Sequence, residues 1–377
     1  MKDNCVGIGV VGAGAIGVRS ALMHFELPDV AEKARIVAVC DPSPGRAKAA
    51  AEKYRIPAWY ESYEELLADN NVDMITLCTP IGLHYEQVMM ALRAGKHIHC
   101  NKTVTTTVEE CDRLMQTAKE KNLHIVPSPG MMTMPHNQRI RRAILEGRIG
   151  EVTMAITGGT GGQNYHIDEP YRHGEDVLTN TNPAWYFKKP GGGPMYDVIV
   201  YFLHIITGIL GPVKRVGAFS GKKVHEYEFR GEKIKNETDD CTLINLDFGN
   251  QLHGICYAVP GGNLGLTEGP FTPVIIGSEG NLFGAKLDGK SLIYEGDHQP
   301  NVTPEHQKLP ENHVFSDIMQ AVDIIRTGDR TIVNMDHARH VIDIIESGYS
   351  SEASGKIIAL QPTAFQPLPI EELAIIK

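Results

Sequence analysis

The 377-residue sequence has few of the features that mark nucleic-acid-binding or membrane-spanning proteins. It carries 36 Lys and Arg against 46 Asp and Glu, a net charge of −10, so it has no basic excess with which to neutralise phosphates. Its longest apolar stretch, Met195 to Leu210, is interrupted by Asp197 and His204 and is too short to cross a bilayer comfortably. We therefore expect neither a nucleic acid nor a membrane as a partner.

The cysteines form neither a disulfide framework nor a metal site. There are seven, an odd number, without a CxxC pair or metal-finger spacing, and several lie in apolar, strand-like runs. This pattern predicts reduced thiols that pack as small core residues. The opening residues resemble no secretory leader, and no His, Asp and Glu cluster has metal-ligand spacing. We expect a cytoplasmic protein without a metal.

Residues 1–128 are predicted to form one domain. Short apolar runs alternate with helical stretches: strands are expected at residues 6–11, 36–40, 74–78, 97–100 and 124–127, and helices at 15–25, 46–54, 63–68, 84–94 and 108–121. Apolar strands that alternate with helices indicate a parallel sheet covered on both faces. The fold class expected here is a doubly wound α/β Rossmann domain.

Residues 129–377 are predicted to form a second domain of a different class. Turn signals such as Gly249-Asn250 separate longer strands. We expect strands at 151–157, 214–220, 241–248, 251–259, 274–277 and near 291–294, and helices at 135–146, 314–326 and 335–350. This pattern predicts an α+β domain with a mostly antiparallel open sheet and helices on one face.

A dinucleotide site is indicated where the first strand ends. Gly12, Gly14 and Gly17 match the G-x-G-x-x-G pattern, which permits a tight turn, close approach of a pyrophosphate and close packing of helix on strand. Asp41 follows the second strand, 24 residues beyond Gly17, where a carboxylate can bind a ribose 2′-hydroxyl and repel a 2′-phosphate. NAD is therefore favoured over NADP, although Arg46 could turn towards a phosphate. The alternative for Asp41 is a plain turn residue.

Polar residues follow two later strands. Thr79-Pro80 comes after residues 74–78, and Asn101-Lys102 comes after residues 97–100. Because ligands of open parallel sheets bind beyond the carboxyl ends of the strands, Lys102 is expected to point into the crevice. The alternative is an ordinary surface lysine.

A row of ionisable residues is expected on the apolar helix that follows Pro194. At ~100° per residue, Asp197, Tyr201 and His204 fall on one helix face. Such a stripe lines a cavity opposite Lys102 or forms a buried hydrogen-bonded network.

The chain resembles the Gfo/Idh/MocA family of sugar and polyol oxidoreductases along nearly its whole length. Besides the glycine motif, the resemblance rests on motifs in family order: Thr79-Pro80-x-x-x-His84, Ala94-Gly-Lys-His97 before Lys102, Gly147-x-Ile-Gly150, Gly191-Gly-Gly-Pro-Met-Tyr-Asp197, and the region 338–355. It implies a Rossmann domain followed by a sheet domain that supplies substrate contacts and a homo-oligomer interface, in a dimer or tetramer. The cofactor contacts it implies are Gly12, Gly14, Ala15, Ile16, Gly17, Asp41, Thr79, Pro80, His84, Asn101 and Lys102.

Two positions depart from the family pattern. Family members usually carry Glu-Lys-Pro where this chain has Asn101-Lys102-Thr103. The family's catalytic histidine, four residues after the aspartate, is Tyr201 here, and His204 stands where the family commonly has an acidic residue.

Together these residues predict an NAD-dependent oxidoreductase that transfers a hydride between a secondary hydroxyl of a sugar, glycoside or polyol and nicotinamide. Lys102 and Asp197 are the first catalytic candidates, followed by Tyr201 and then His204. The polar and aromatic residues expected to contact the sugar, or alternatively to lie at a subunit interface, are Lys102, Tyr165, His166, Asn182, Trp185, Asp197 and Tyr201. Two other functions stay open: a glycosidase or lyase that recycles tightly bound NAD, and a non-catalytic dinucleotide sensor.

Overall fold

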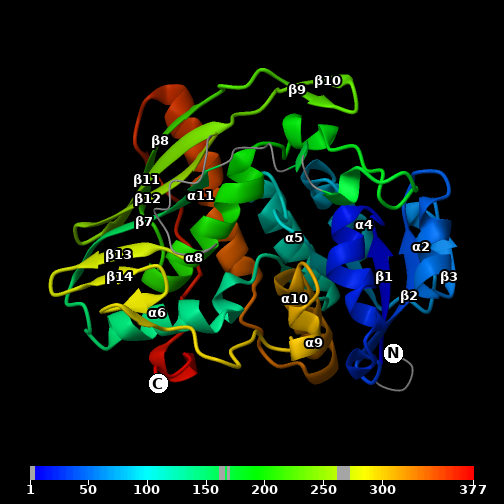
Figure 1. Cartoon of the computed structure of the whole chain (residues 1–377), viewed down its shortest axis with the longest axis horizontal. Helices are drawn as coiled ribbons and strands as arrows, with labels where there is room; N and C mark the ends of the chain where they lie inside the picture. The colour runs from blue at the N-terminus through cyan, green and yellow to red at the C-terminus, as the bar shows by residue number, and fades with distance from the viewer. Residues whose placement is uncertain (1–4, 161–165, 168–169, 261–271) are drawn as a thin grey trace.

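Two sheets organise the chain (Figure 1). The computed structural model describes residues 5–160, 166–167, 170–260 and 272–377. The N-terminal sheet is parallel, has the strand order β3-β2-β1-β4-β5-β6, and consists of β1 (Val6–Val11), β2 (Ala34–Cys40), β3 (Ala58–Tyr60), β4 (Met74–Leu77), β5 (His97–Cys100) and β6 (Ile125–Pro127). All six strands run in the same direction, and the order in which the chain adds them reverses between β1 and β4, the position where doubly wound folds bind dinucleotides.

Helices cover both faces of the N-terminal sheet, and one of them comes from the far end of the chain. One apolar layer lies under α3 (Tyr63–Leu67), α4 (His84–Arg93) and α5 (Val108–Lys121). On the other face, α2 (Arg46–Tyr54) and the first helical turns are joined by α10 (Asn312–Thr327), whose Phe315 and Ile318 pack with Ile8 and Val10 of β1. The core of the first sheet is therefore completed by residues beyond 128.

The C-terminal sheet has the strand order β16-β15-β14-β13-β7-β12-β11-β8-β17. All of its neighbouring strands are antiparallel except β7 and β12. The strands are β7 (Val152–Thr160), β8 (Arg215–Gly221), β11 (Cys241–Gly249), β12 (Leu252–Val259), β13 (Val274–Gly277), β14 (Asn281–Phe283), β15 (Lys286–Leu287), β16 (Lys290–Ser291) and β17 (Ile358–Ala359). Together with the N-terminal sheet, this confirms the predicted fold class.

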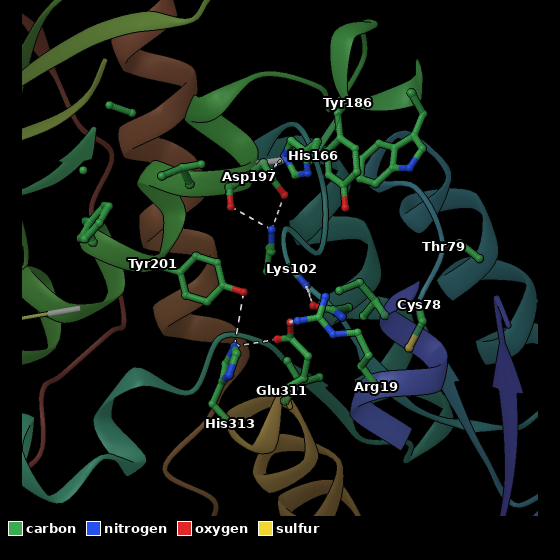
Figure 2. A pocket seen from close by; sticks show the side chains of 18 of the residues that line it. Arg19, Cys78, Thr79, Lys102, His166, Tyr186, Asp197, Tyr201, Glu311 and His313 are labelled. Carbon is green, nitrogen blue, oxygen red and sulfur yellow. Dashed lines mark hydrogen bonds and ion pairs between the residues drawn. The ribbon is translucent and has the colours of Figure 1, made fainter. Parts of the chain in front are cut away.

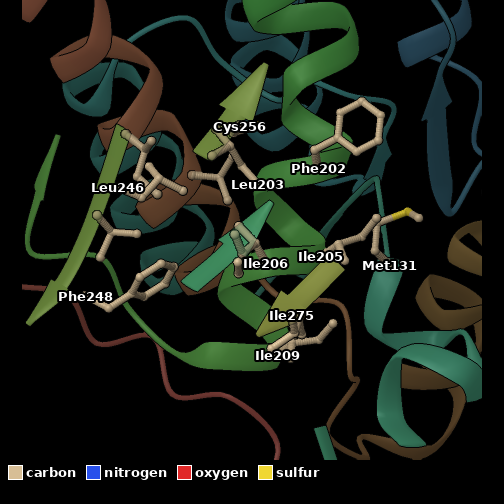
Figure 3. Packing of buried hydrophobic residues seen from close by; sticks show 14 of the residues in the cluster. Met131, Phe202, Leu203, Ile205, Ile206, Ile209, Leu246, Phe248, Cys256 and Ile275 are labelled. Atoms are coloured by element: carbon tan, nitrogen blue, oxygen red, sulfur yellow. The ribbon is translucent and has the colours of Figure 1, made fainter. Parts of the chain in front are cut away.

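The apolar helix α8 (Val200–Leu210) is the centre of the second core (Figure 3). A π-helical turn, Met195–Ile199, leads into it. Leu203, Ile206 and Ile209 are fully buried against the sheet. Helices α6 (Pro135–Leu145) and α11 (Met335–Ser354) pack beside α8, and the short α9 (Pro304–Gln307) precedes α10. This packing makes α8 a rigid support for the polar residues at its N-terminal end.

Several local predictions differ from the structure. The expected helix 15–25 consists of α1 (Ala15–Gly17), a π-helical turn (Val18–Leu22) and a 3-10 turn (His24–Glu26). The strand expected near 291–294 is only Lys290–Ser291. The strand β3 and the hairpin of β9 (Glu226–Phe229) and β10 (Glu232–Lys235) were not predicted, because strands this short carry little periodic signal.

All seven cysteines are free thiols. Among the helices of the described part of the chain, none combines the length and the apolarity needed to cross a bilayer.

Candidate active site

The turn between β1 and α1 has the geometry that the glycine motif predicts. Gly12 has φ +93°, a value that side chains disfavour, and a Cβ on Gly17 would lie 1.9 Å from the carbonyl oxygen of Gly12. A Cβ on Gly14 would meet only Thr181, at 3.4 Å. Positions 12 and 17 thus require glycine for the turn itself, and the backbone at Gly14 is left open to a ligand.

Asp41 braces this turn. Its buried carboxylate accepts hydrogen bonds from the backbone N–H of Ala13 and of Ser43, each at 2.9 Å. Arg46 lies 3.3 Å from the same carboxylate and also donates to the carbonyl oxygens of Val177 (2.9 Å) and Asn180 (3.1 Å). Arg46 is therefore held by protein groups and is not free to turn towards a phosphate.

The carboxyl ends of β4 and β5 form the next part of the site. The backbone N–H of Lys102 donates to the Asn101 side chain (2.7 Å), and the Thr103 hydroxyl donates to the carbonyl oxygen of Tyr196 (2.6 Å). His84 contacts both strand-end loops, with its ring nitrogens 2.8 Å from the carbonyl oxygen of Thr103 and 2.9 Å from that of Thr79. These bonds fix the loop that carries Lys102 against the start of the π-helical turn.

Lys102, Asp197 and His166 form a compact buried cluster (Figure 2). Lys102 Nζ is bonded to the carboxylate of Asp197 and donates to the carbonyl oxygen of the same residue at 2.8 Å. The second carboxylate oxygen lies 2.7 Å from His166 Nε2. Asp197 is 2% exposed, so its charge is balanced by protein groups rather than by water.

The charge states in this cluster follow from burial and from the neighbouring charges. Burial alone raises the pKa of Asp197, but Lys102 and His166 outweigh it and hold that pKa well below its usual value. Burial lowers the pKa of His166 to about 4, with Asp197 opposing the shift. At neutral pH the cluster therefore holds a carboxylate and a neutral imidazole.

Tyr201 connects Lys102 to a second polar wall. Lys102 Nζ lies 5.1 Å above the centre of the Tyr201 ring, and the Tyr201 hydroxyl lies 3.4 Å from His313 Nε2. Glu311 lies between His313, at 3.7 Å, and Arg19, at 3.0 Å. Burial raises the pKa of Tyr201 well above its usual value, and nearby carboxylates add to the shift, so the phenol stays protonated.

These groups line a cavity of about 560 Å³, a size typical of small-molecule sites. Of the predicted site residues, those that line it are Ile16, Thr79, Asn101, Lys102, His166, Trp185, Asp197 and Tyr201. Four charged or ionisable lining residues were not predicted: Arg19, Arg172, Glu311 and His313. Arg19 could have been found from its position two residues after Gly17, but no sequence motif marks the other three.

Other predicted residues lie outside the cavity. His84 holds two loops together, and the side chain of Asn182 accepts a hydrogen bond from the backbone N–H of Ala184 at 2.8 Å, where it is exposed. Gly12, Gly14, Ala15, Gly17, Asp41 and Pro80 belong to the supporting turns and are not among its lining residues. Tyr165 lies outside the described residues.

His204 does not join Asp197 and Tyr201 in the cavity. It lies about one helical turn beyond Tyr201, where α11 packs against α8. It packs instead against His337, whose ring is tilted by 56° and has its centre 4.5 Å away, and His337 lies 2.7 Å from the Thr207 hydroxyl. Burial lowers the pKa of His204 to about 3 and that of His340, close by, to about 4. His204 therefore lies among buried histidines, outside the cavity that Asp197 and Tyr201 line.

This histidine network predicts acid sensitivity. A histidine whose folded pKa lies below its usual value of 6.5 stabilises the fold fully above that pH, and this stability is lost as the pH falls towards the folded pKa. Replacing His204 by Gln is expected to reduce the drop in the free energy of unfolding between neutral pH and about pH 5, measured by urea titration at each pH. An unchanged pH dependence would contradict the assignment of His204 as a buried neutral group.

The described residues contain no group of three or more His, Cys, Asp or Glu side chains placed to hold a metal ion.

Comparison with known proteins points to one family. Residues 6–127 match the family model described as "Oxidoreductase family, NAD-binding Rossmann fold", and residues 137–282 match that of the "GFO/IDH/MocA C-terminal domain". D-glucoside 3-dehydrogenase of Escherichia coli K12 is 26% identical over 226 residues, which cover 59% of this chain and 60% of that protein. A trans-1,2-dihydrobenzene-1,2-diol dehydrogenase of Mus musculus is 25% identical over 72% of both chains. The match to the E. coli protein thus spans about three fifths of its length.

Solved structures share the fold. A levoglucosan dehydrogenase, solved with NADH and levoglucosan, superposes with a TM-score of 0.73 at 18% identity, covering 95% of this chain and all of that chain. A putative myo-inositol dehydrogenase from Sinorhizobium meliloti 1021 gives a TM-score of 0.69 at 20% identity, covering 94% of this chain and all of that one.

Proposed function

Because the chain belongs to the Gfo/Idh/MocA oxidoreductase family, we propose that it is an NAD-dependent dehydrogenase that oxidises a secondary hydroxyl of a sugar, glycoside or polyol. The observation that carries this proposal is the buried bond between Lys102 and Asp197 in a cavity that begins at the glycine-rich turn. That arrangement puts a proton-handling group beside the place where doubly wound sheets bind the cofactor.

The residues present suit a dinucleotide. Gly12 and Gly17 form the tight β1–α1 turn, and Gly14 leaves the backbone there accessible. Asp41 directly follows β2, and Ile16, Thr79 and Asn101 line the cavity next to Lys102. The nicotinamide, when bound, supplies the hydride acceptor.

We assign the transfer of the substrate's hydroxyl proton to Lys102. Its amine form takes the proton of the substrate hydroxyl as the hydride leaves the same carbon, and the ammonium form returns it in the reverse direction. Asp197 orients Nζ and stabilises the ammonium that forms, and His166 fixes the other carboxylate oxygen. Tyr201, protonated and in contact with His313, is placed to donate a hydrogen bond to the substrate oxygen.

The aromatic side of the cavity suits the apolar C–H face of a sugar ring. The ring of Tyr186 stacks on His166 with centres 3.3 Å apart and on Trp185 with centres 3.5 Å apart. Such a stack offers a flat apolar wall whose edges carry hydrogen-bonding groups. We assign Trp185 and His166 to substrate contact on this basis.

The test of the proposed activity is direct. Purified protein is incubated with NAD and a panel of sugars, glycosides and polyols, and NADH absorbance is followed. We expect NADH to form with at least one panel member. Release of free sugar from a glycoside without net NADH, together with stoichiometric nicotinamide in denatured protein, would instead identify an NAD-recycling glycosidase. Binding of NAD without any hydride transfer would identify a sensor.

NAD rather than NADP is the proposed cofactor. Arg46 is engaged by Asp41 and by two backbone carbonyls, and the Asp41 carboxylate repels a 2′-phosphate. Replacing Asp41 by Ser is expected to lower the ratio of kcat/KM for NAD to that for NADP by roughly tenfold, measured with both cofactors at a fixed substrate concentration. A ratio unchanged by this substitution would show that Asp41 does not select the cofactor.

We propose that the chain forms a homo-oligomer through the outer face of its C-terminal sheet. On the sheet face opposite α8, Phe219 is 74% exposed, and Ile357 nearby is 69% exposed. A second copy of the chain would cover these side chains. Light scattering coupled to size exclusion tests this, with a dimer or tetramer as the expected mass and a monomer as the contrary one.

The free thiols fit the proposed location in the cytoplasm.

A further inference from the structure

Arg172 is a buried cation in the cavity wall. It lies at the end of a 3-10 turn, Pro170–Arg172, is 4% exposed, and lines the same cavity as Lys102. Among the residues that the structure describes, no carboxylate lies within ion-pair distance of its guanidinium, and its buried Nε has no hydrogen-bond partner. A buried charge without a counter-ion is strongly unfavourable, so the Arg172 guanidinium requires an anionic partner.

The other two cations of the cavity are already balanced. Lys102 is bonded to Asp197, and Arg19 is bonded to Glu311 at 3.0 Å. Asp197 is also bonded to His166, and Glu311 also lies near His313, so each carboxylate is engaged on both sides. The cavity therefore carries one positive charge that its described residues do not match.

The position of Arg172 relates it to the reaction centre. Its Nη2 donates to the Tyr186 hydroxyl at a long 3.4 Å, and its guanidinium lies 5.1 Å from the centre of the Tyr186 ring. The same ring stacks on His166, which is bonded to Asp197. Contacts through the Tyr186 and His166 rings thus connect Arg172 to the Lys102–Asp197 bond, and all of these residues line the same cavity.

We propose that Arg172 binds an oxyanion carried by the substrate, so that the natural substrate is a sugar acid or a sugar phosphate rather than a neutral sugar. This rests on the proposed function. A guanidinium presents its N–H donors in a planar fork that matches two oxygens of a carboxylate or a phosphate. The sugar ring lies along the aromatic wall, the anion lies against Arg172, and the reacting hydroxyl lies at Lys102.

The cofactor phosphates are the other oxyanions that could reach this cavity. Doubly wound folds bind the pyrophosphate at the glycine-rich turn, here Gly12–Gly17, whereas the Arg172 guanidinium contacts Tyr186, far along the chain from that turn. This favours the substrate as the source of the anion, and the experiment measures cofactor affinity separately.

The experiment compares matched pairs of ligands on the NAD-loaded protein. Titration calorimetry and steady-state kinetics are run with D-glucuronate against D-glucose, D-galacturonate against D-galactose, and D-glucose 6-phosphate as the phosphate probe. We expect at least one charged member to bind roughly 10–100-fold more tightly than its neutral partner. Replacing Arg172 by Gln removes that preference, and Arg172→Lys retains part of it. Arg148→Gln, an exposed arginine outside the cavity, is the matched control and retains it fully.

The outcomes separate this inference from the proposed function. Hydride transfer with neutral sugars, combined with no preference for any charged partner in the unaltered protein, overturns the inference and leaves the dehydrogenase in place; this comparison needs no variant to fold. Weaker NAD binding in Arg172→Gln with unchanged sugar affinity assigns the guanidinium to the cofactor and also overturns it. Hydride transfer to no substrate at all refutes the proposed function itself.

Discussion

Replacing Lys102 by Met is expected to lower kcat by about 10²–10⁴-fold while NAD still binds. The substitution keeps most of the side-chain volume and removes the ammonium group that bonds the Asp197 carboxylate from the loop after β5. The hydroxyl proton then has no positioned acceptor, so the transition state is disfavoured more than the bound ground state. Steady-state kinetics and calorimetry with NAD measure the two effects separately.

The matched control is Lys121→Met, an exposed lysine at the end of α5. It removes the same charge far from the cavity and is expected to leave kcat unchanged. The pH profile adds a second readout, since an enzyme that uses Lys102 for the proton loses one limb of its profile in Lys102→Met. A Lys102→Met enzyme with ordinary kcat would contradict the assignment.

Replacing Asp197 by Leu is expected to lower the free energy of unfolding by about 3–5 kcal/mol and to abolish activity. The carboxylate is 2% exposed and balances Lys102, so its loss leaves an ammonium in a mostly apolar wall. Because the folded pKa of Asp197 lies below its usual value of 3.8, its stabilisation is present above that pH and is lost as the pH falls below it. Urea titration at neutral pH measures the loss.

A double variant shows whether Asp197→Leu loses stability because the Lys102 ammonium has lost its charge partner. Lys102→Met combined with Asp197→Leu replaces the buried ion pair by two apolar side chains, and such replacements are often neutral or stabilising. We expect the double variant to recover most of the stability that Asp197→Leu loses, and to remain inactive. A double variant as unstable as Asp197→Leu alone would point to packing rather than charge.

The part of the site that local sequence rules govern could be predicted. The glycine motif and the rule that ligands bind beyond the strand ends identified Gly12, Gly17 and Lys102. Helix periodicity gave Asp197 and Tyr201 on one face, and the structure brings both to Lys102, 95 residues away in sequence from Asp197. Sequence rules suffice for these placements because each depends on a turn, a strand end or one turn of helix.

The part of the site that depends on packing between distant segments could not be predicted. Glu311 and His313 enter the cavity because the start of α10 lies against the N-terminal sheet, and no motif marks that contact. His204 fell on the predicted stripe, but α11 covers its side of the helix with His337. Periodicity gives a residue's direction on a helix and does not say which neighbour lies there.

Local sequence rules also miss the bond between His166 and Asp197. The family resemblance places a histidine four residues after the aspartate, where this chain has Tyr201. The histidine bonded to Asp197 is instead His166, 31 residues earlier in the chain, which reaches the carboxylate from the segment after β7. The aspartate thus keeps a histidine partner supplied by another element, while Tyr201 occupies the position next to Lys102.

The most direct test of the account is titration calorimetry with NAD on folded protein from which bound nucleotide has been removed. The account predicts saturable binding of one NAD per chain, retained in Lys102→Met and weakened when a larger side chain replaces Gly14 at the open position of the turn. If neither NAD nor NADP produces any heat of binding, the account is contradicted.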